Sequence, residues 1–172
     1  MKKSVLILIA LVSIVSINAQ TKVAHINTQK LLDTLPSRKV ALKQISEFQQ
    51  KGEMELKDME ADLQKTYQKY MAEQNTLTPV MKQYEEERIQ KKQQGLQQRE
   101  QELQQQISLL GNELNAPILK RVQKAVKTVS ISKKLNYVID ESTTLYFDGG
   151  TDITNDVMLE LLRLDASETS KK

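Results

Sequence analysis

The feature that most constrains this chain is a long stripe of apolar residues at helical spacing. From Ser37 onward, apolar or small residues recur every three or four positions, which is the period of an α-helix and far from the period of a strand. The residues between them are mostly Glu, Lys, Gln and Asp, so the stripe is narrow and favours a single partner helix over a broad core. Its members are Ile45, Phe48, Gly52, Leu56, Met59, Leu63, Tyr67 and Tyr70.

A turn and a second stripe follow. Thr78 can cap a helix that starts at Pro79, the position where a missing N–H costs least. Ten of the 24 residues from 83 to 106 are Gln, a composition also found in disordered segments, but the sustained stripe favours exposed coiled-coil surface. We therefore predict that residues 37–116 form a long antiparallel helical hairpin. The second stripe consists of Tyr84, Leu96, Leu103, Ile107, Leu110 and Leu114.

Signals for other elements lie on both sides of this hairpin. Before it, residues 22–27 alternate as in a strand, and Thr28 can cap a short helix that Pro36 stops. After it, Pro117 is expected to kink or interrupt the return helix, and Asn136 is expected to end it in a left-handed conformation.

The C-terminal part predicts two more strands and a last helix. Residues 137–140 and 144–147 have strand-like composition and are separated by a turn at 141–143. Asp152 or Thr154 can cap an amphipathic helix that carries Val157 and Leu161. Residues 167–172 are polar and are predicted to form a disordered tail.

Residues 1–19 have the composition of a secretory signal peptide. Lys2 and Lys3 precede an almost wholly apolar run at 5–17, which is short for a transmembrane helix, and a small polar exit follows. We expect cleavage after Ala19, with an uncleaved anchor as the alternative. Because the chain has no Cys, a lipid anchor on a cysteine is excluded.

The composition makes most enzyme classes improbable. The chain has no Cys and one His, which excludes a disulfide framework, a thiolate metal site and a Cys nucleophile and argues against a His-based catalytic triad. Asp140, Glu141 and Asp148 flank turns without the Gly-rich loops or Arg clamps of an acid–base site. We expect no catalytic residue, no metal and no cofactor, and we interpret His25 as a structural or surface residue.

Charge is balanced overall but unevenly distributed. Without Lys2 and Lys3 the chain has 23 basic and 22 acidic residues, which argues against a nucleic-acid partner. Residues 117–139 contain six bases and no acid, whereas residues 140–172 contain eight acids and three bases. We expect these two segments to lie side by side or to face solvent, with a basic patch for an anionic lipid or client as the alternative.

The residues outside the hairpin are too few to build a self-sufficient core. Aromatic residues make up only 4% of the chain, and three short strands would leave open edges. The predicted fold is therefore α+β and mostly α, with the hairpin projecting from a small β-containing oligomerisation body at 20–36 and 117–166. Candidate residues for self-association are Val23, Ile26, Val138, Ile139, Leu145 and Phe147.

The order of these motifs resembles a known family. A signal peptide precedes KVAHINTQKLL at 22–32, and the Gln-rich hairpin is followed by PILKRVQKAV at 117–126, YVID at 137–140 and DITNDV at 152–157. In this order the chain resembles the Skp/OmpH family of periplasmic chaperones. The resemblance implies a homotrimer whose helical arms enclose a cavity, which holds unfolded outer-membrane β-barrel proteins without ATP. Residues 38–73 contain seven bases and seven acids, unlike strongly basic arms, so a lipopolysaccharide site is not carried over.

Candidate client contacts lie near the turn of the hairpin. Met71, Leu77 and Met81 can offer adaptable contacts to varied apolar segments, although methionines in such a hairpin can also simply pack its helices. Two other kinds of function use the same features. A structural coiled-coil scaffold would use the stripes, and a peripheral membrane protein could use the basic face between Lys120 and Lys134.

Overall fold

The chain forms two compact units. The computed structural model describes residues 21–169, so the predicted signal peptide at 1–19 and the last three residues of the predicted tail lie outside it. One unit, the body, contains the described residues up to Leu35 and from Leu119 onward, and the other, the arm, contains Pro36–Ile118. No helix within residues 21–169 is long and apolar enough to cross a membrane.

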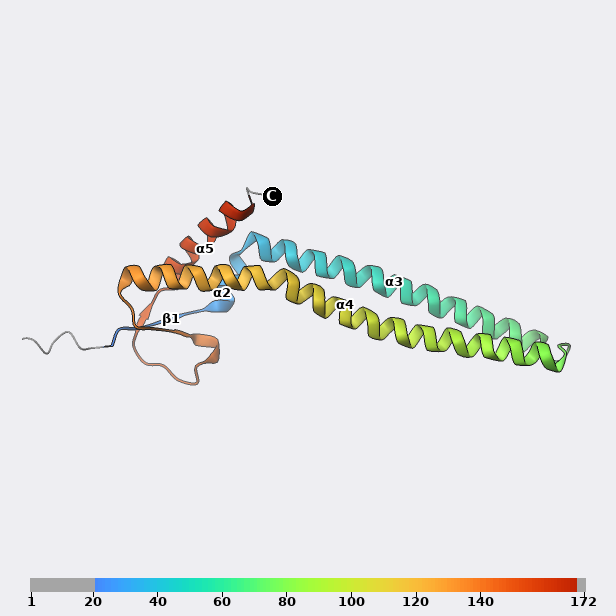
Figure 1. Cartoon of the computed structure of the whole chain (residues 1–172). Helices are drawn as coiled ribbons and strands as arrows, with labels where there is room; N and C mark the ends of the chain where they lie inside the picture. Colours follow the sequence, from blue (N-terminus) through green and yellow to red (C-terminus); the bar gives the residue numbers. More distant parts are fainter. Residues whose placement is uncertain (1–20, 170–172) are drawn as a thin grey trace, which may run out of the picture. The chain divides into compact units, whose positions relative to one another are not determined.

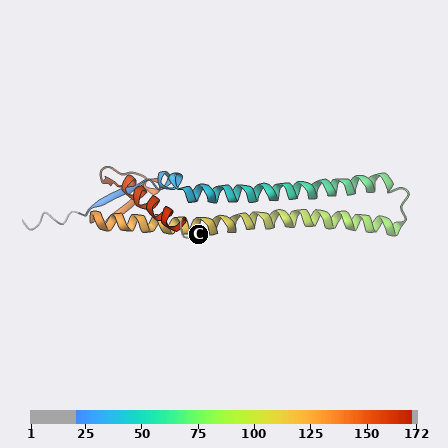
Figure 2. The ribbon, with the colours of Figure 1, turned by 90° about the horizontal axis from the view of Figure 1, so that it is seen from above.

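The arm is a pair of antiparallel helices. α3 (Pro36–Glu73) leads to a short turn, and α4 (Pro79–Lys133) returns beside it (Figure 1, Figure 2). The Thr78 hydroxyl accepts a hydrogen bond from the N–H of Met81 at 3.4 Å, so both the cap and the start of this helix are confirmed. Pro36 is the first residue of α3, a position that requires no N–H partner.

We expected Pro117 to kink or interrupt the return helix; α4 continues through Pro117 to Lys133, so the helix is not interrupted there. A proline inside a helix removes one backbone hydrogen bond and normally favours a break. Here Ile118 and Val122, one and five residues further on, are buried. Apolar burial along the continuous helix therefore offsets the local cost of the proline.

Four contacts between the helices define the register of the arm. The Leu103 side chain lies directly over Gly52, where an added Cβ would collide with it. Further along, Arg99 pairs with Glu55, Lys92 pairs with Asp62, and the Tyr70 hydroxyl donates to Glu86. In this register Phe48 is opposite Ile107, and Ile45 is opposite Leu110.

We call the buried contact between α3 and α4 the seam. It differs from the predicted stripes at one position on each helix. Tyr67 and Tyr84 are exposed, whereas Thr66 and Ile89 are buried. A step of three from Leu63 leads to Thr66, and this position faces the partner helix although its side chain is polar. The Thr66 hydroxyl donates to the carbonyl of Asp62 at 2.8 Å, which satisfies it within the helix.

The body contains a three-stranded parallel sheet. Its strands are β1 (Val23–Ile26), β2 (Tyr137–Asp140) and β3 (Thr151–Asp152), in the order β2-β1-β3. Ala24 and Ile26 are buried while Val23 is exposed, which is the alternation expected of a strand covered on one face. The strands predicted at 22–27 and 137–140 are thus confirmed.

Three helical segments supply the rest of the body's core. They are α2 (Thr28–Thr34), the last turns of α4 and α5 (Thr154–Thr169). Arg121 pairs with Asp165 and Glu168, and Lys133 pairs with Asp156, so the basic and acidic segments lie side by side as expected. The core residues from these segments and from the residues directly next to them are Leu31, Leu35, Val122, Ala125, Val129, Ile153, Val157, Leu161 and Leu164.

The strand predicted at 144–147 is absent from the described chain. After β2, a short 3₁₀ helix, η2 (Glu141–Thr143), turns the chain, and the Thr143 and Thr144 hydroxyls donate to the carbonyl of Asp140. These local hydrogen bonds replace the turn of a hairpin. Gly149 and Gly150, both at φ 92°, then direct the chain into β3, which pairs with β1 instead.

Three predicted boundaries are also corrected. α2 is capped by the side chain of Asn27, which accepts from the N–H of Lys30 at 2.9 Å, and not by Thr28. Lys134, at φ 54°, takes the left-handed position predicted for Asn136, whose side chain instead accepts from the N–H of Lys22. α5 extends to Thr169, so residues 167–169 of the predicted tail are helical.

Gly52 and Gly95, two of the three glycines within the helices of the arm, allow a test of the seam. We expect Gly95→Ala to stabilise the arm by about 1 kcal/mol, because nothing lies near that position and alanine favours the helix. Gly52→Ala should instead be less stable than Gly95→Ala by about 1–3 kcal/mol, because the new methyl group must displace buried Leu103. Urea unfolding followed by circular dichroism measures both. Equal stabilisation by the two substitutions would contradict the close contact at Gly52.

Candidate functional site

The body exposes a cluster of apolar side chains around the sheet. β2 and β3 are both edge strands within the described chain, because β1 is paired on both sides. The exposed cluster, which we call the apolar face, comes from β1, β2 and the segment after η2. It consists of Val23, Tyr137, Ile139, Leu145, Tyr146 and Phe147.

The predicted self-association residues separate into two groups. Val23, Ile139, Leu145 and Phe147 belong to the apolar face, and Leu145 is fully exposed. Ile26 is buried in the core of its own chain, and Val138 is half-buried. Val138 and Asp140 lie on one face of β2, and the more exposed face consists of Tyr137 and Ile139.

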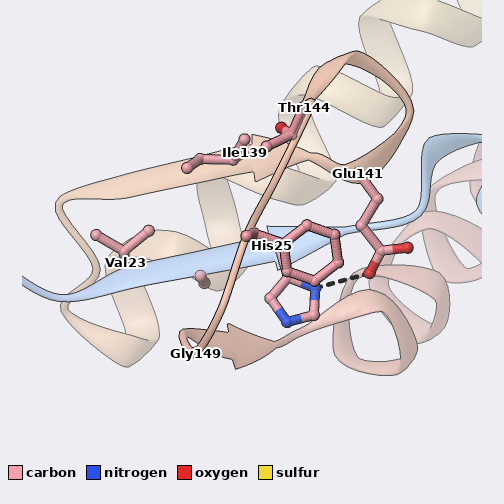
Figure 3. Close-up of a pocket in the computed structure, with 8 residues that line it drawn as sticks. Val23, His25, Ile139, Glu141, Thr144 and Gly149 are labelled. Carbon is pink, nitrogen blue, oxygen red and sulfur yellow. Dashed lines mark hydrogen bonds and ion pairs between the residues drawn. The ribbon is translucent and has the colours of Figure 1, made fainter.

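A small cavity lies under the segment that follows η2 (Figure 3). Its volume is about 30 Å³, and Val23, Ala24, Ile139 and Phe147 form its apolar walls. The rings of His25 and Phe147 lie 4.9 Å apart at 37°, which holds the segment against the sheet. A cavity of this size has room for one or two water molecules, so it is a packing gap and not a ligand pocket.

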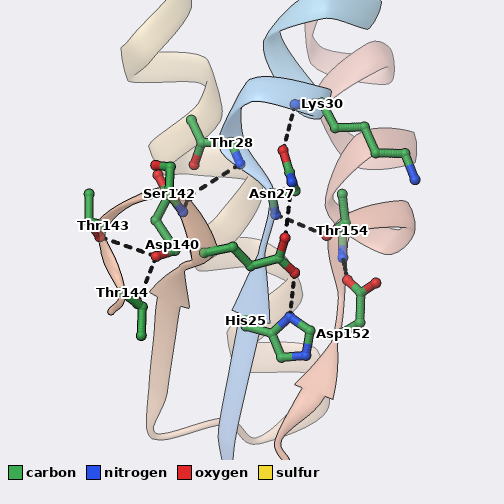
Figure 4. A network of polar contacts seen from close by, with 11 residues as sticks. His25, Asn27, Thr28, Lys30, Asp140, Ser142, Thr143, Thr144, Asp152 and Thr154 are labelled. Atoms are coloured by element: carbon green, nitrogen blue, oxygen red, sulfur yellow. Dashed lines mark hydrogen bonds and ion pairs between the residues drawn. The ribbon is translucent and has the colours of Figure 1, made fainter. Parts of the chain in front are cut away.

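A polar network joins the ends of the strands (Figure 4). His25 Nδ1 and Glu141 Oε1 are 2.7 Å apart, and Glu141 Oε2 accepts from the side-chain amide of Asn27 at 3.0 Å. The N–H of Asn27 in turn donates to the Thr154 hydroxyl at 3.1 Å. Because these residues come from β1, η2 and α5, the network fixes segments that are far apart in the sequence. His25 is therefore a hydrogen-bonded structural residue, as interpreted from the sequence.

Within residues 21–169, one group of side chains could in principle hold a metal ion, and it belongs to this network. His25, Glu141 and Asp152 place ligand atoms within 4.8 Å of one another. Asp152, however, accepts from the N–H of Thr154 at 2.8 Å, and hydrogen bonds from Thr154 lower its pKa. The carboxylate thus stabilises the positive N-terminal end of α5, which would repel a cation at the same point. We interpret the cluster as a structural network in which Asp152 caps α5 and Glu141 joins His25 to Asn27.

The predicted client-contact residues at the turn of the arm differ in how exposed their side chains are. Met71 and Met81 are exposed, while Leu77 is half-buried. Val80 is the most exposed large apolar side chain of the arm and was not predicted. Val80 lies in the first turn of α4, directly after Pro79. Its exposure could have been inferred from the sequence, because Val80 belongs to neither of the two apolar stripes.

Two open grooves follow the helices of the arm. One runs along α3 and has Met54 and Met59 beside three carboxylates. The other lies on α4 and has Tyr84 beside Arg88, Lys91 and Lys92. Both combine apolar and charged groups without a deep pocket, so they suit weak contacts with varied chains and not recognition of one small molecule.

The chain is similar in sequence to proteins of one family. The sequence matches the family described as outer membrane protein (OmpH-like) over residues 22–161. The chaperone protein Skp of Yersinia pestis is 33% identical over 154 residues, covering 89% of this chain and 93% of the relative. The chaperone protein Skp of Photorhabdus laumondii is 29% identical over the same coverage. This chain belongs to the OmpH-like family.

A solved OmpH-like structure agrees at the level of fold. The crystal structure of an OmpH-like outer membrane chaperone from Caulobacter crescentus CB15 superimposes with a TM-score of 0.72 and covers 87% of this chain and 86% of its own. The two sequences are 16% identical, so this likeness shows the fold alone. The family resemblance and the mostly helical fold predicted from the sequence are therefore confirmed.

The basic segment of this OmpH-like chain is partly neutralised. Arg121 and Lys133, two of its six bases, pair with acids of α5. Lys120, Lys124 and Lys127 are exposed on α4. The positive face is thus weaker than the sequence alone indicates, and a role at an anionic membrane surface gains no support from it.

Proposed function

We propose that this protein is a periplasmic holdase chaperone that binds unfolded outer-membrane β-barrel proteins without ATP and prevents their aggregation. The observation that carries the proposal is the arm. It is a long helical hairpin that buries one narrow seam and leaves methionines exposed along its sides and at its turn. The OmpH-like family and the chaperone names of its Skp relatives support the same conclusion.

In the proposed mechanism, the arm makes many weak contacts with an unfolded client and catalyses no reaction. Unfolded barrel proteins expose alternating apolar residues and unpaired strand edges, which aggregate when they meet. Exposed Met54, Met71 and Met81 can adapt to many apolar sequences, and the charged side chains around them keep the arm soluble. We propose that Met71, Leu77 and Met81 contact clients at the turn, with Val80 added to this group. No catalytic residue, metal or cofactor is needed.

We propose that the protein reaches its clients by secretion. Residues 1–19 would direct export and would be removed after Ala19, leaving the mature protein in the periplasm. A structural envelope scaffold and a peripheral membrane-binding protein are the alternatives, and neither explains the exposed methionines at the turn.

We further propose that the body self-associates, as a homotrimer, through the apolar face. Val23, Ile139 and Phe147 leave a continuous apolar surface beside the edge strand β2. A second copy of the chain could cover it and pair with the segment at 144–147, which has no strand partner in the described chain. Exposed apolar surface of this kind next to unpaired edges is typical of an assembly interface.

Leu145 allows a test of self-association that does not disturb the single chain. Because its side chain is fully exposed, Leu145→Asp should leave the body's own fold intact. If assembly buries the side chain, the unpaired charge should cost several kcal/mol and the oligomer should dissociate. Light scattering with size-exclusion chromatography measures the mass. Leu159→Asp, at an exposed position of α5, serves as the matched control and should keep the wild-type mass. A monomeric wild type, or an unchanged Leu145→Asp oligomer, would refute the proposal.

Shortening the arm tests the chaperone function. Residues 63–91 can be deleted and Asp62 joined to Lys92 by a short turn, which keeps the observed register because these two residues already pair. The oligomer should remain intact, while suppression of aggregation of a denatured outer-membrane barrel protein should fall sharply. Undiminished suppression would mean that the arm is only a spacer. Loss of the oligomer would mean that assembly and client binding are not divided between body and arm.

A further inference from the structure

The seam of the arm changes character at the Gly52–Leu103 contact. We call residues 36–52 with 103–118 the base half and residues 53–102 the tip half. In the base half, the register places apolar residues opposite each other, such as Phe48 and Ile107. Gly52 and Leu103 are themselves buried, so this half is closed by apolar packing.

In the tip half, charged residues take one side of alternate layers of the seam, while the layers between them place Met59 opposite Leu96 and buried Thr66 opposite buried Ile89. The register places Leu56 opposite Arg99 and Leu63 opposite Lys92. The side chains of Arg99 and Lys92 are both 23% exposed, because their aliphatic stems lie along the seam. Nearer the turn, the Tyr70 hydroxyl donates to Glu86 Oε1 at 2.5 Å.

The charged heads of these cations reach across to the other helix. Arg99 binds Glu55 with two hydrogen bonds, Nε to Oε1 at 2.9 Å and Nη2 to Oε2 at 2.8 Å. Lys92 pairs with Asp62. The side chains of Glu55 and Asp62 are 50% and 61% exposed, so both ion pairs are open to water and dissolved ions. Salt screens such pairs, whereas it does not weaken apolar packing.

Acid acts on the same contacts as salt. The hydrogen bond from Arg99 lowers the pKa of Glu55, and the hydrogen bond from Lys92 lowers the pKa of Asp62, with Arg88 and Lys65 adding to the effect on Asp62. A carboxylate with a lowered pKa stabilises the folded state above its ordinary pKa, and this stabilisation is lost as the pH falls through the lowered value.

We propose that the arm is a two-part clasp in which the tip half opens by breaking the Glu55–Arg99 and Asp62–Lys92 ion pairs while the base half stays closed. Opening would expose the apolar side of the tip seam, including Leu56, Met59 and Leu63, which are half-buried when the helices are paired. The proposal concerns the free protein and does not depend on the proposed chaperone function.

Hydrogen exchange measured by mass spectrometry on the mature protein tests the clasp. Raising NaCl from about 20 mM to about 500 mM should speed amide exchange in the tip half by roughly two- to fivefold and leave the base half unchanged. Uniform acceleration along the arm, or faster exchange in the base half, would overturn the proposal.

Substitutions separate the cross-helix pairs from charge in general. At low salt, Glu55→Gln and Asp62→Asn should each reproduce the effect of high salt in the tip half. Glu47→Gln is the matched control, because Glu47 pairs with Lys43 on its own helix. Its exchange should match the wild type, and an effect equal to that of Asp62→Asn would count against the clasp.

A charge exchange gives the last check. Combining Asp62→Lys with Lys92→Asp reverses the pair and should restore part of the protection that Asp62→Asn loses, because Arg88 and Lys65 repel a cation at position 62. If exchange stays as fast as in Asp62→Asn, the residue acts by something other than the ion pair and the proposal fails.

Discussion

The contact between Leu103 and Gly52 sets the register on which the arm depends. A helix can approach this closely only where one partner has no side chain, and the buried Leu103 fills the space that results. Once this layer is fixed, the remaining residues of the two helices meet in a determined order, including the pairing of Arg99 with Glu55. The outer faces of both helices stay in water because one seam is all that the hairpin buries. A long surface for weak contacts follows directly from this narrow seam.

The body and the arm differ in the kind of surface that each leaves exposed. The arm has abundant polar surface and closes its seam within one chain. The body has a small core, a sheet with two open edges and an apolar face that includes Ile139 and Leu145. Its polar network, centred on His25 and Glu141, organises the strand ends, and His25 contacts Phe147, but Leu145 and Tyr146 remain exposed. The division of proposed roles, with assembly in the body and client contact in the arm, rests on this difference in surface.

The parts that could be predicted from the sequence are those governed by local periodicity. The apolar spacing from Ile45 to Tyr70 implied the long helix, and Thr78 with Pro79 implied the turn and the second helix. The choice of Thr66 over Tyr67 could not be predicted, because it depends on the register and not on polarity. The segment at 144–147 has the composition of a strand, yet its pairing depends on contacts distant in sequence. Ion pairs between the two helices, such as Asp62–Lys92, likewise could not be predicted from the sequence, because only the register shows which residues of α3 and α4 meet.

The surface residues illustrate a further limit. Met71 and Met81 are exposed as a client contact requires, and Val80 became apparent only when the neighbours of the turn were known. Exposure makes contact with a client possible, but it does not identify the client. Likewise, Leu145 was proposed as a self-association residue from the strand-like composition of residues 144–147, while its complete exposure emerged only from the conformation of the segment after η2.

The most direct measurement of the central claim uses the mature wild-type protein and a urea-denatured outer-membrane barrel protein, diluted together without ATP. Light scattering reports aggregation, and native mass spectrometry reports the complex. The account predicts that aggregation is suppressed and that one client is held by an assembly of several copies of this chain. Aggregation at the rate of the client alone, with no complex formed, would contradict it.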